Sequence, residues 1–162
     1  MALHEQSVGK TNEWYTPALV FMALGCRFDM DVAAPEDRRF VCTPTNRWLT
    51  SDSLEREWDG FIWMNPPFGG RNGLIPWLDK FFKHGHGIAL VPDRTSAPWW
   101  QTFARKANSI LFVSPKLDFI DTNGVPGDSP AQGTCLFAAG ERAEDALNMA
   151  QAKGLGLVMV RL

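Results

Sequence analysis

The chain has 162 residues, a length that fits one domain built around one core. Hydrophobic residues make up 45% and charged residues 21% of the sequence, as in soluble globular domains, and no run of about 18 apolar residues predicts a membrane span. The net charge of −2 excludes an overtly basic nucleic-acid binder and is compatible only with a local basic patch.

The first third of the chain predicts two short elements and a long irregular segment. Residues 1–12 are expected to be flexible, and because they lack the apolar stretch of a signal peptide they indicate a cytoplasmic location. A helix is expected over residues 17–24, with Thr16 as its N-cap. Alternating side chains predict a strand over residues 28–33, and residues 34–58 are expected to be irregular.

Apolar periodicity predicts strands and helices in alternation over the rest of the chain. Strands are expected over residues 61–64, 87–92, 110–113, 134–138 and 155–160. Helices are expected over residues 73–84, 97–107 and 141–153. Residues 117–120 are expected to pair back onto the preceding strand, before a loop over residues 121–133. The alternation favours a single-domain, three-layer α/β fold with a mostly parallel sheet and antiparallel C-terminal strands.

Polar residues follow three of the predicted strands. Asp31 ends the first strand, Asn65 follows the second, and Asp93-Arg94 follows the third. Because parallel sheets bind ligands at the carboxyl ends of their strands, we expect these residues to lie near one functional site.

The tetrapeptide Asn65-Pro66-Pro67-Phe68 resembles the Asn-Pro-Pro-aromatic catalytic signature of amino-group methyltransferases. Further segments, in order and spacing from about residue 12 to residue 138, resemble the phage-type DNA adenine methyltransferase family in particular. They are Glu13-Trp14-Tyr15-Thr16-Pro17, residues 28–34, Asp52-Ser53-Leu54 before Trp58, and Pro92-Asp93-Arg94-Thr95 before Trp99-Trp100. The resemblance implies a trimmed, Rossmann-like methyltransferase fold that uses S-adenosylmethionine to methylate the 6-amino group of adenine in DNA, in a phage or prophage protein.

The chemistry of the motif fits this resemblance. An exocyclic amino group is a poor nucleophile, because its lone pair is delocalised into the ring. By analogy, the Asn65 side-chain oxygen and the Pro66 carbonyl accept its hydrogens, and the prolines Pro66 and Pro67 hold that turn rigid. Phe68 would stack on the flipped-out base. The sulfonium donor carries its own leaving group, so catalysis is mostly alignment and requires no metal.

The resemblance also implies the residues of a donor pocket. They are Trp14, Thr16, Pro17, Asp31 and Asp52. The chain departs from many methyltransferases in one respect, because the glycine-rich donor loop is absent and the first strand continues into Asp31-Val32-Ala33-Ala34-Pro35. This departure favours the phage-type group.

The prediction of DNA binding depends on cationic residues scattered along the sequence. Arg71, Arg94 and Lys116 are the residues expected to meet phosphates. The loop at 121–133 fits a lid, a DNA-contacting element or a disordered segment. The three cysteines form no CxxC pair, so no metal site is expected. We expect a monomer or a homodimer.

Two alternatives stay open at this point. Asn-Pro-Pro-aromatic motifs also serve methyltransferases that act on protein glutamine or on RNA, although those usually carry the glycine-rich loop. The other alternative is a degenerate, non-catalytic DNA-binding module, against which the intact tetrapeptide argues.

Overall fold

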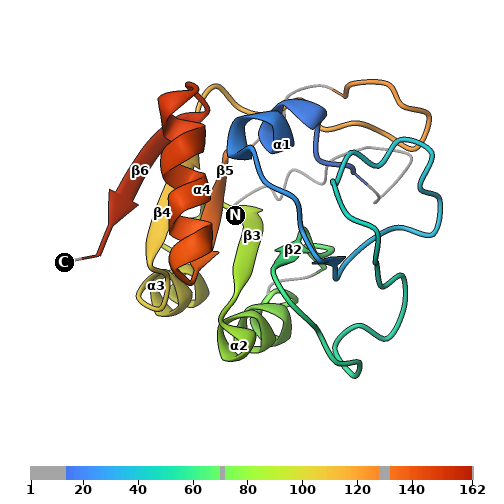
Figure 1. Ribbon diagram of the computed structural model, residues 1–162. Coiled ribbons are helices and arrows are strands. Elements are labelled where there is room, and N and C mark those ends of the chain that lie inside the picture. Colours follow the sequence, from blue (N-terminus) through green and yellow to red (C-terminus); the bar gives the residue numbers. More distant parts are fainter. Residues whose placement is uncertain (1–13, 70–71, 128–131, 162) are drawn as a thin grey trace, which may run out of the picture.

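A computed structural model of the chain describes residues 14–69, 72–127 and 132–161 (Figure 1). Its helices are α1 (Ala18–Leu24), α2 (Ile75–His84), α3 (Pro98–Ala104) and α4 (Glu141–Ala152). Its strands are β1 (Met30–Asp31), β2 (Ile62–Met64), β3 (Gly87–Pro92), β4 (Ser109–Val113), β5 (Thr134–Ala139) and β6 (Gly156–Val160). The predicted flexibility of residues 1–12 lies outside the described residues.

The strands form one mixed sheet in the order β1-β2-β3-β5-β4-β6. β1, β2 and β3 are parallel, whereas β5 runs antiparallel to both β3 and β4, and β6 runs antiparallel to β4. The prediction of a mostly parallel sheet is therefore wrong, although the antiparallel strands near the C-terminus are confirmed. The reason is the connection between β4 and β5, whose described residues 114–127 and 132–133 carry no crossover helix, so that the chain returns as an antiparallel strand between β3 and β4.

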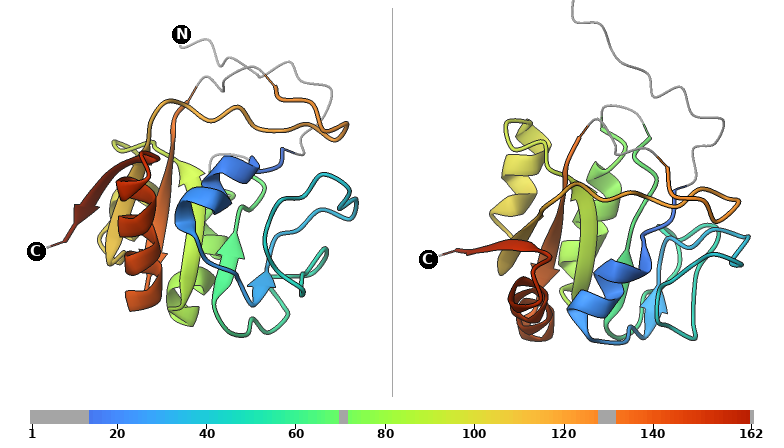
Figure 2. Two further views of the ribbon diagram at one scale, coloured as in Figure 1. Left: turned by 45° about the horizontal axis from the view of Figure 1, so that its top comes forward. Right: turned by 90° about the horizontal axis from the view of Figure 1, so that it is seen from above.

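Helices cover both faces of this sheet and make three layers, as predicted (Figures 1 and 2). α1 and α4 pack on one face with Trp63, Leu90 and other strand residues. α2 and α3 pack on the opposite face with the neighbouring strand residues, such as Met64 and Val91. Since both faces are buried, β2 and β3 are continuous apolar runs, and β5 is apolar after Thr134.

β1 is shorter than the predicted strand at residues 28–33. Its outer neighbour is part of the irregular segment, because the Asp31 amide donates to the Arg47 carbonyl and the Leu49 amide donates to the Asp31 carbonyl, each at 2.9 Å. Among the described residues, the irregular segment pairs with β1 through one isolated bridge, between Asp31 and Trp48, and forms no further strand there. Residues 32–60 thus extend the molecule beyond the β1 edge without regular structure, as expected for most of this range (Figure 1).

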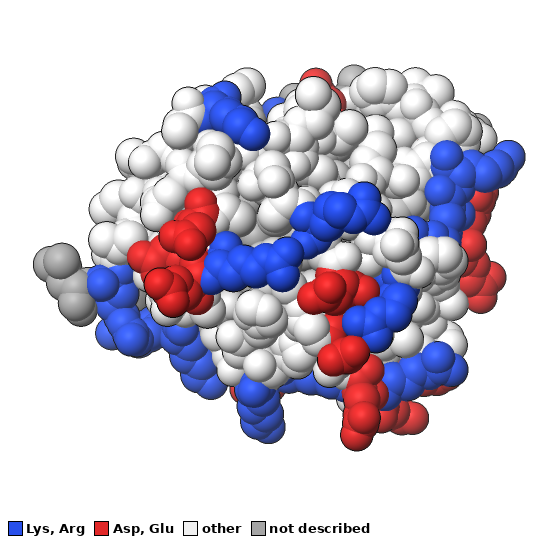
Figure 3. All heavy atoms as spheres, viewed as in Figure 1, with Lys and Arg blue, Asp and Glu red and all other residues white. Residues whose placement is uncertain are grey.

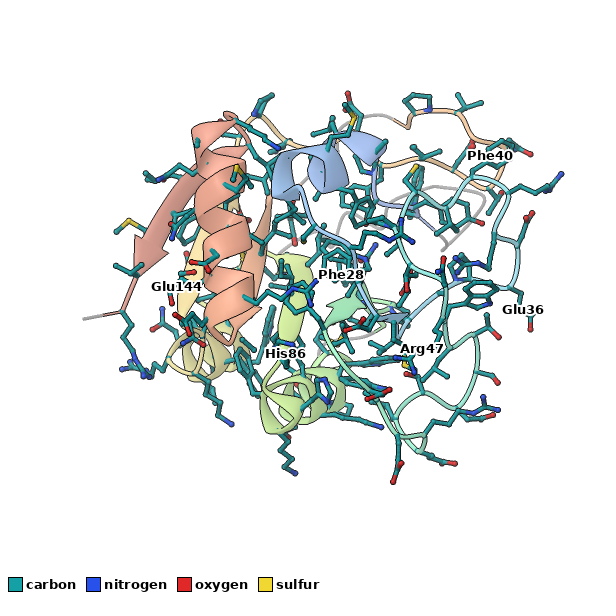
Figure 4. The ribbon with its side chains drawn as sticks, viewed as in Figure 1. Phe28, Glu36, Phe40, Arg47, His86 and Glu144 are labelled. Atoms are coloured by element: carbon teal, nitrogen blue, oxygen red, sulfur yellow. The ribbon has the colours of Figure 1, made fainter. Side chains whose placement is uncertain are left out.

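A small ribbon joins the N-terminal segment to the connection after β4. Tyr15 and Ile120 exchange backbone hydrogen bonds of 2.8 and 3.0 Å, and Ile120 also bridges Pro126. Residues 117–120 therefore do not pair back onto β4 as predicted, because Tyr15 supplies the partner. Phe40 lies against Gly124 at the tip of this ribbon (Figure 4), where an added Cβ would come within 2.6 Å of the ring.

Candidate active site

The Asn-Pro-Pro-Phe turn leaves the sheet at the carboxyl end of β2. The three residues of β2 are buried, Asn65 is half-buried and Pro66 is buried. Phe68 lies beyond the turn with 44% of its surface exposed. Because β1 and β3 run parallel to β2, their carboxyl ends lie at the same edge of the sheet. Asp31 ends β1, and Asn65 and Asp93 directly follow β2 and β3, so all three residues lie at that edge.

Asn65 is held by a residue from the N-terminal segment. Its Nδ2 atom donates a hydrogen bond of 3.1 Å to Oγ1 of Thr16, which is buried. Since the amide nitrogen makes this contact, Oδ1 is the side-chain atom that is left to accept a hydrogen bond from another group. Thr16 does not cap α1 as predicted, because Pro17 is the N-cap residue and makes no side-chain cap. The contact instead joins a predicted donor-pocket residue to a predicted catalytic residue.

Asp31 is a buried carboxylate at the same edge, with 3% of its surface exposed. The Thr43 hydroxyl donates to Oδ2 at 2.9 Å and the Ala33 amide donates to Oδ1 at 3.2 Å. Burial raises the pKa of the Asp31 carboxyl, while these hydrogen bonds and the charge of Arg38 oppose that rise. A buried acid at a strand end fits a ligand site better than a surface turn.

Arg38 completes this polar cluster, and sequence reasoning missed it. Its guanidinium carbon lies 3.7 Å from the ring centroid of Trp48. Its Nη1 atom is buried and has no hydrogen-bond partner among the described residues. A buried N–H group without an acceptor is unfavourable by about 1–3 kcal/mol, and an anionic ligand would relieve this cost. Asp37-Arg38-Arg39 resembles an ordinary solvated charge run, so the sequence carries no signal for this role.

Asp52 lies in a turn that the fold ties to the end of β1. Asp52 is exposed and has a φ of 53°, in the left-handed region. The neighbouring Ser53 is buried, and its hydroxyl donates to the Val32 carbonyl, one residue after Asp31. The Trp58 indole donates to the Ser53 carbonyl at 3.0 Å. The structure thus anchors the turn that carries Asp52 to the chain just beyond Asp31.

Lys80 holds the same turn from α2, which leads to a stability prediction. Its Nζ atom donates to the carbonyls of Ser53 at 2.8 Å and Leu54 at 3.0 Å, and also to that of Arg56. Lys80→Met is expected to lower the free energy of unfolding by about 1–2 kcal/mol, because those carbonyls lose a charged donor. Urea unfolding measures this change. Lys83→Met, an exposed position on the same helix, is the matched control, and equal stabilities of the two variants would contradict the role of Lys80.

Trp14 and Pro17 flank Thr16 at this edge. Pro17 is buried, and Trp14 is 39% exposed. The Trp14 ring packs so closely on Gly127 that a Cβ added there would lie 2.5 Å from it. The loop predicted at 121–133 is an ordered hairpin over its described first part, where the Asp121 side chain accepts from the amides of Asn123 and Val125 at 2.8 and 2.9 Å.

The two predicted DNA-binding cations that the structure describes, Arg94 and Lys116, come from different segments. Arg94 is exposed after β3, and its Nε donates to Oε1 of Gln132 at 2.7 Å. Arg94 and Phe68 line one pocket. Lys116 is exposed in the segment after β4, and Arg71 lies outside the described residues.

The face formed by α1 and α4 carries cationic and anionic side chains interspersed, with no extended basic field (Figure 3). Arg47 on this side is paired with Asp59 at 2.8 Å.

A comparison with family models assigns the chain to a class that fits this α/β fold and its edge site. A model described as DNA N-6-adenine-methyltransferase (Dam) matches residues 5–147. Because the match covers most of the 162 residues, the chain belongs to this family, and at family level it is a DNA N6-adenine methyltransferase. No curated protein and no solved structure matches the chain.

Two further properties concern metals and membranes. Among the described residues, no group of three or more His, Cys, Asp or Glu side chains is placed to hold a metal ion. None of the helices in the described ranges is long and apolar enough to cross a membrane.

Proposed function

We propose that the chain transfers a methyl group from S-adenosylmethionine to the 6-amino nitrogen of adenine in DNA, at the carboxyl edge of β1, β2 and β3. The observation that carries this proposal is the Asn65 amide, fixed by Thr16 in a proline-stiffened turn near the buried carboxylate of Asp31. The family match supports the acceptor, because it describes adenine methylation in DNA.

On the acceptor side, Asn65 and Pro66 act on the target nitrogen. The Asn65 side-chain oxygen and the Pro66 carbonyl accept its two hydrogens, which concentrates the lone pair on nitrogen for attack. Because the 3.1 Å contact with Thr16 and the proline rings fix these acceptors beforehand, little reorganisation is needed in the reaction. Phe68, exposed beside the turn, offers its ring to the flipped base. The amino nitrogen gains the methyl group and then loses one proton.

On the donor side, the residues present suit a zwitterion. The amino-acid end of S-adenosylmethionine carries an ammonium and a carboxylate. The buried carboxylate of Asp31 suits the ammonium, and the unsatisfied Nη1 of Arg38 suits the carboxylate. When bound, the sulfonium donor supplies an activated methyl group together with its leaving group. Trp14, Thr16, Pro17 and Asp52 belong to the same pocket in this proposal.

The finer predictions are part of this proposal. We infer a single domain of phage or prophage origin that acts in the host cytoplasm as a monomer or homodimer. Arg94, Arg71 and Lys116 are assigned to the phosphates. The rival acceptors, protein glutamine and RNA, receive no support from the family match, which describes DNA adenine.

An acceptor assay tests the proposal. The purified chain is incubated with methyl-labelled S-adenosylmethionine and with DNA, RNA or a protein extract, and DNA nucleosides are then separated. We expect label in DNA, recovered as N6-methyl-2′-deoxyadenosine. Label recovered only from protein or only from RNA would contradict DNA as the acceptor and support a methyltransferase that acts on that other substrate. Failure of calorimetry to detect donor binding would support a non-catalytic DNA-binding module.

A further inference from the structure

β6 forms the outer edge of the sheet, and no described element lies beyond it (Figures 1 and 2). The amide of Val158, the central residue of this strand, donates a 2.7 Å hydrogen bond to Oε1 of Gln151 in α4. Because a residue in an antiparallel strand directs its N–H and C=O to the same side, the backbone groups of Val158 face away from β4. The alternation along the strand then directs those of Gly156 and Val160 outward too.

This edge lacks the usual protection against pairing with another strand. Natural edge strands carry charged side chains, prolines or bulges that block such pairing. β6 contains no charged residue and no proline. The side chain of Gln151 covers the central N–H group, and the outward groups of Gly156 and Val160 have no hydrogen-bond partner among the described residues. The edge therefore keeps backbone donors and acceptors for a further strand.

The side chains of β6 leave an apolar surface on one side of the sheet. Val158 packs against the core under α1 and α4, so the alternation of a strand directs Leu157 and Met159 to the opposite side. α3 packs on that side, yet Leu157 is 60% and Met159 is 55% exposed. A strand that pairs with this edge would therefore meet both free backbone groups and apolar side chains.

β6 is complementary to a second copy of itself. In an antiparallel pair centred on Val158, this residue lies opposite Val158 of the second copy, and Gly156 lies opposite Val160. All of these residues direct their backbone groups outward, so each opposed pair can exchange two hydrogen bonds. Leu157 lies opposite Met159 on the apolar side, and the strand brings no like charges together. Such a pair has the two-fold symmetry of a closed dimer.

We propose that two copies of the chain pair through β6 and that Gln151 competes with the second copy for this edge. Pairing of two five-residue strands covers less surface than a standard protein interface, so the dimer is weak and sensitive to that competition. Because antiparallel pairing reverses one copy relative to the other, the two candidate active sites lie at opposite edges of the extended sheet. The inference is independent of the proposed function, and each site is expected to work separately.

Sedimentation over about a hundredfold range of protein concentration tests the pairing. Wild type is expected to associate weakly. Gln151→Ala is expected to dimerise at about tenfold lower concentration, because each copy loses the hydrogen bond that competes with the second copy. Gln101→Ala is the matched control, since Gln101 is an exposed helical glutamine that donates to the Thr95 carbonyl away from β6. Gln151→Ala that is monomeric at every concentration, or that associates no more tightly than wild type, would overturn the inference.

A charge placed in the strand pair gives a second test. Met159→Lys is expected to stay monomeric, also in combination with Gln151→Ala, because a lysine on an edge strand opposes pairing. Met149→Lys is the matched control, since Met149 is 50% exposed on α4, and it is expected to associate like wild type. Hydrogen exchange of the Gly156 and Val160 amides is expected to slow as concentration rises. Association of Met159→Lys equal to that of wild type, or unchanged exchange of these amides in the dimer, would contradict pairing through β6.

Discussion

Asn65→Ala is expected to reduce methyl transfer to DNA by roughly 100-fold or more, the size of loss seen when one pre-oriented catalytic hydrogen-bond partner is removed. The physical reason is that the adenine amino group loses the side-chain acceptor that draws density onto its nitrogen. Single-turnover rates with saturating donor measure the loss, and calorimetry with S-adenosylmethionine is expected to give a nearly unchanged affinity.

Asn65→Asp is the comparison that separates chemistry from folding. A carboxylate still offers an acceptor oxygen, and the Thr16 hydroxyl can rotate to donate to the other one. We expect Asn65→Asp to retain far more activity than Asn65→Ala. Since Asn65→Ala leaves the buried Thr16 hydroxyl without this contact, its free energy of unfolding is expected to fall by about 1 kcal/mol. Full activity in Asn65→Ala would remove the proposed mechanism.

The sequence predicted the elements well where both faces of the sheet are buried. β3 is an apolar run, as is β5 after Thr134, and such runs identify strands without identifying their direction. The direction of β5 depends on residues 114–133, whose lack of helical periodicity left the crossover unspecified. β1 was predicted too long, because its outer partner around Trp48 is irregular and supports only two strand residues.

In the candidate site, too, the contiguous motif could be predicted from the sequence, whereas contacts between residues far apart in the chain could not. The Asn-Pro-Pro-Phe turn is contiguous, so its position after β2 could be predicted from the sequence. Asn65 and Thr16 are 49 residues apart, and their hydrogen bond depends on how α1 packs on the sheet. Arg38 stacks on Trp48 and its charge acts on Asp31 only because an irregular segment folds back on β1. Periodicity does not encode such contacts.

Asp31→Asn is expected to weaken S-adenosylmethionine binding by about tenfold or more, equivalent to about 1.4 kcal/mol, because the buried charge that would pair with the donor ammonium is removed. The substitution preserves the local hydrogen bonds. Oδ1 still accepts from the Ala33 amide, and the new amide nitrogen can donate to the Thr43 hydroxyl. Asp29→Asn is the matched control, because Asp29 is exposed and its carboxylate accepts from the Phe61 amide instead.

The same substitution is expected to leave the unliganded chain at least as stable as wild type at neutral pH. Burial raises the pKa of Asp31 above its ordinary value of 3.8, so the folded state holds the proton more tightly than the unfolded state. The resulting stability is fully present below pH 3.8 and is lost as pH rises through the folded pKa. Above the folded pKa, ionisation of the buried Asp31 carboxyl therefore opposes folding, and asparagine removes that cost. Thermal unfolding from about pH 4 to pH 8 measures the difference. If the stability of wild type and that of Asp31→Asn change with pH in the same way, burial of the carboxylate has no cost. If Asp31→Asn is more stable but binds the donor more weakly, the carboxylate serves binding at the expense of folding stability.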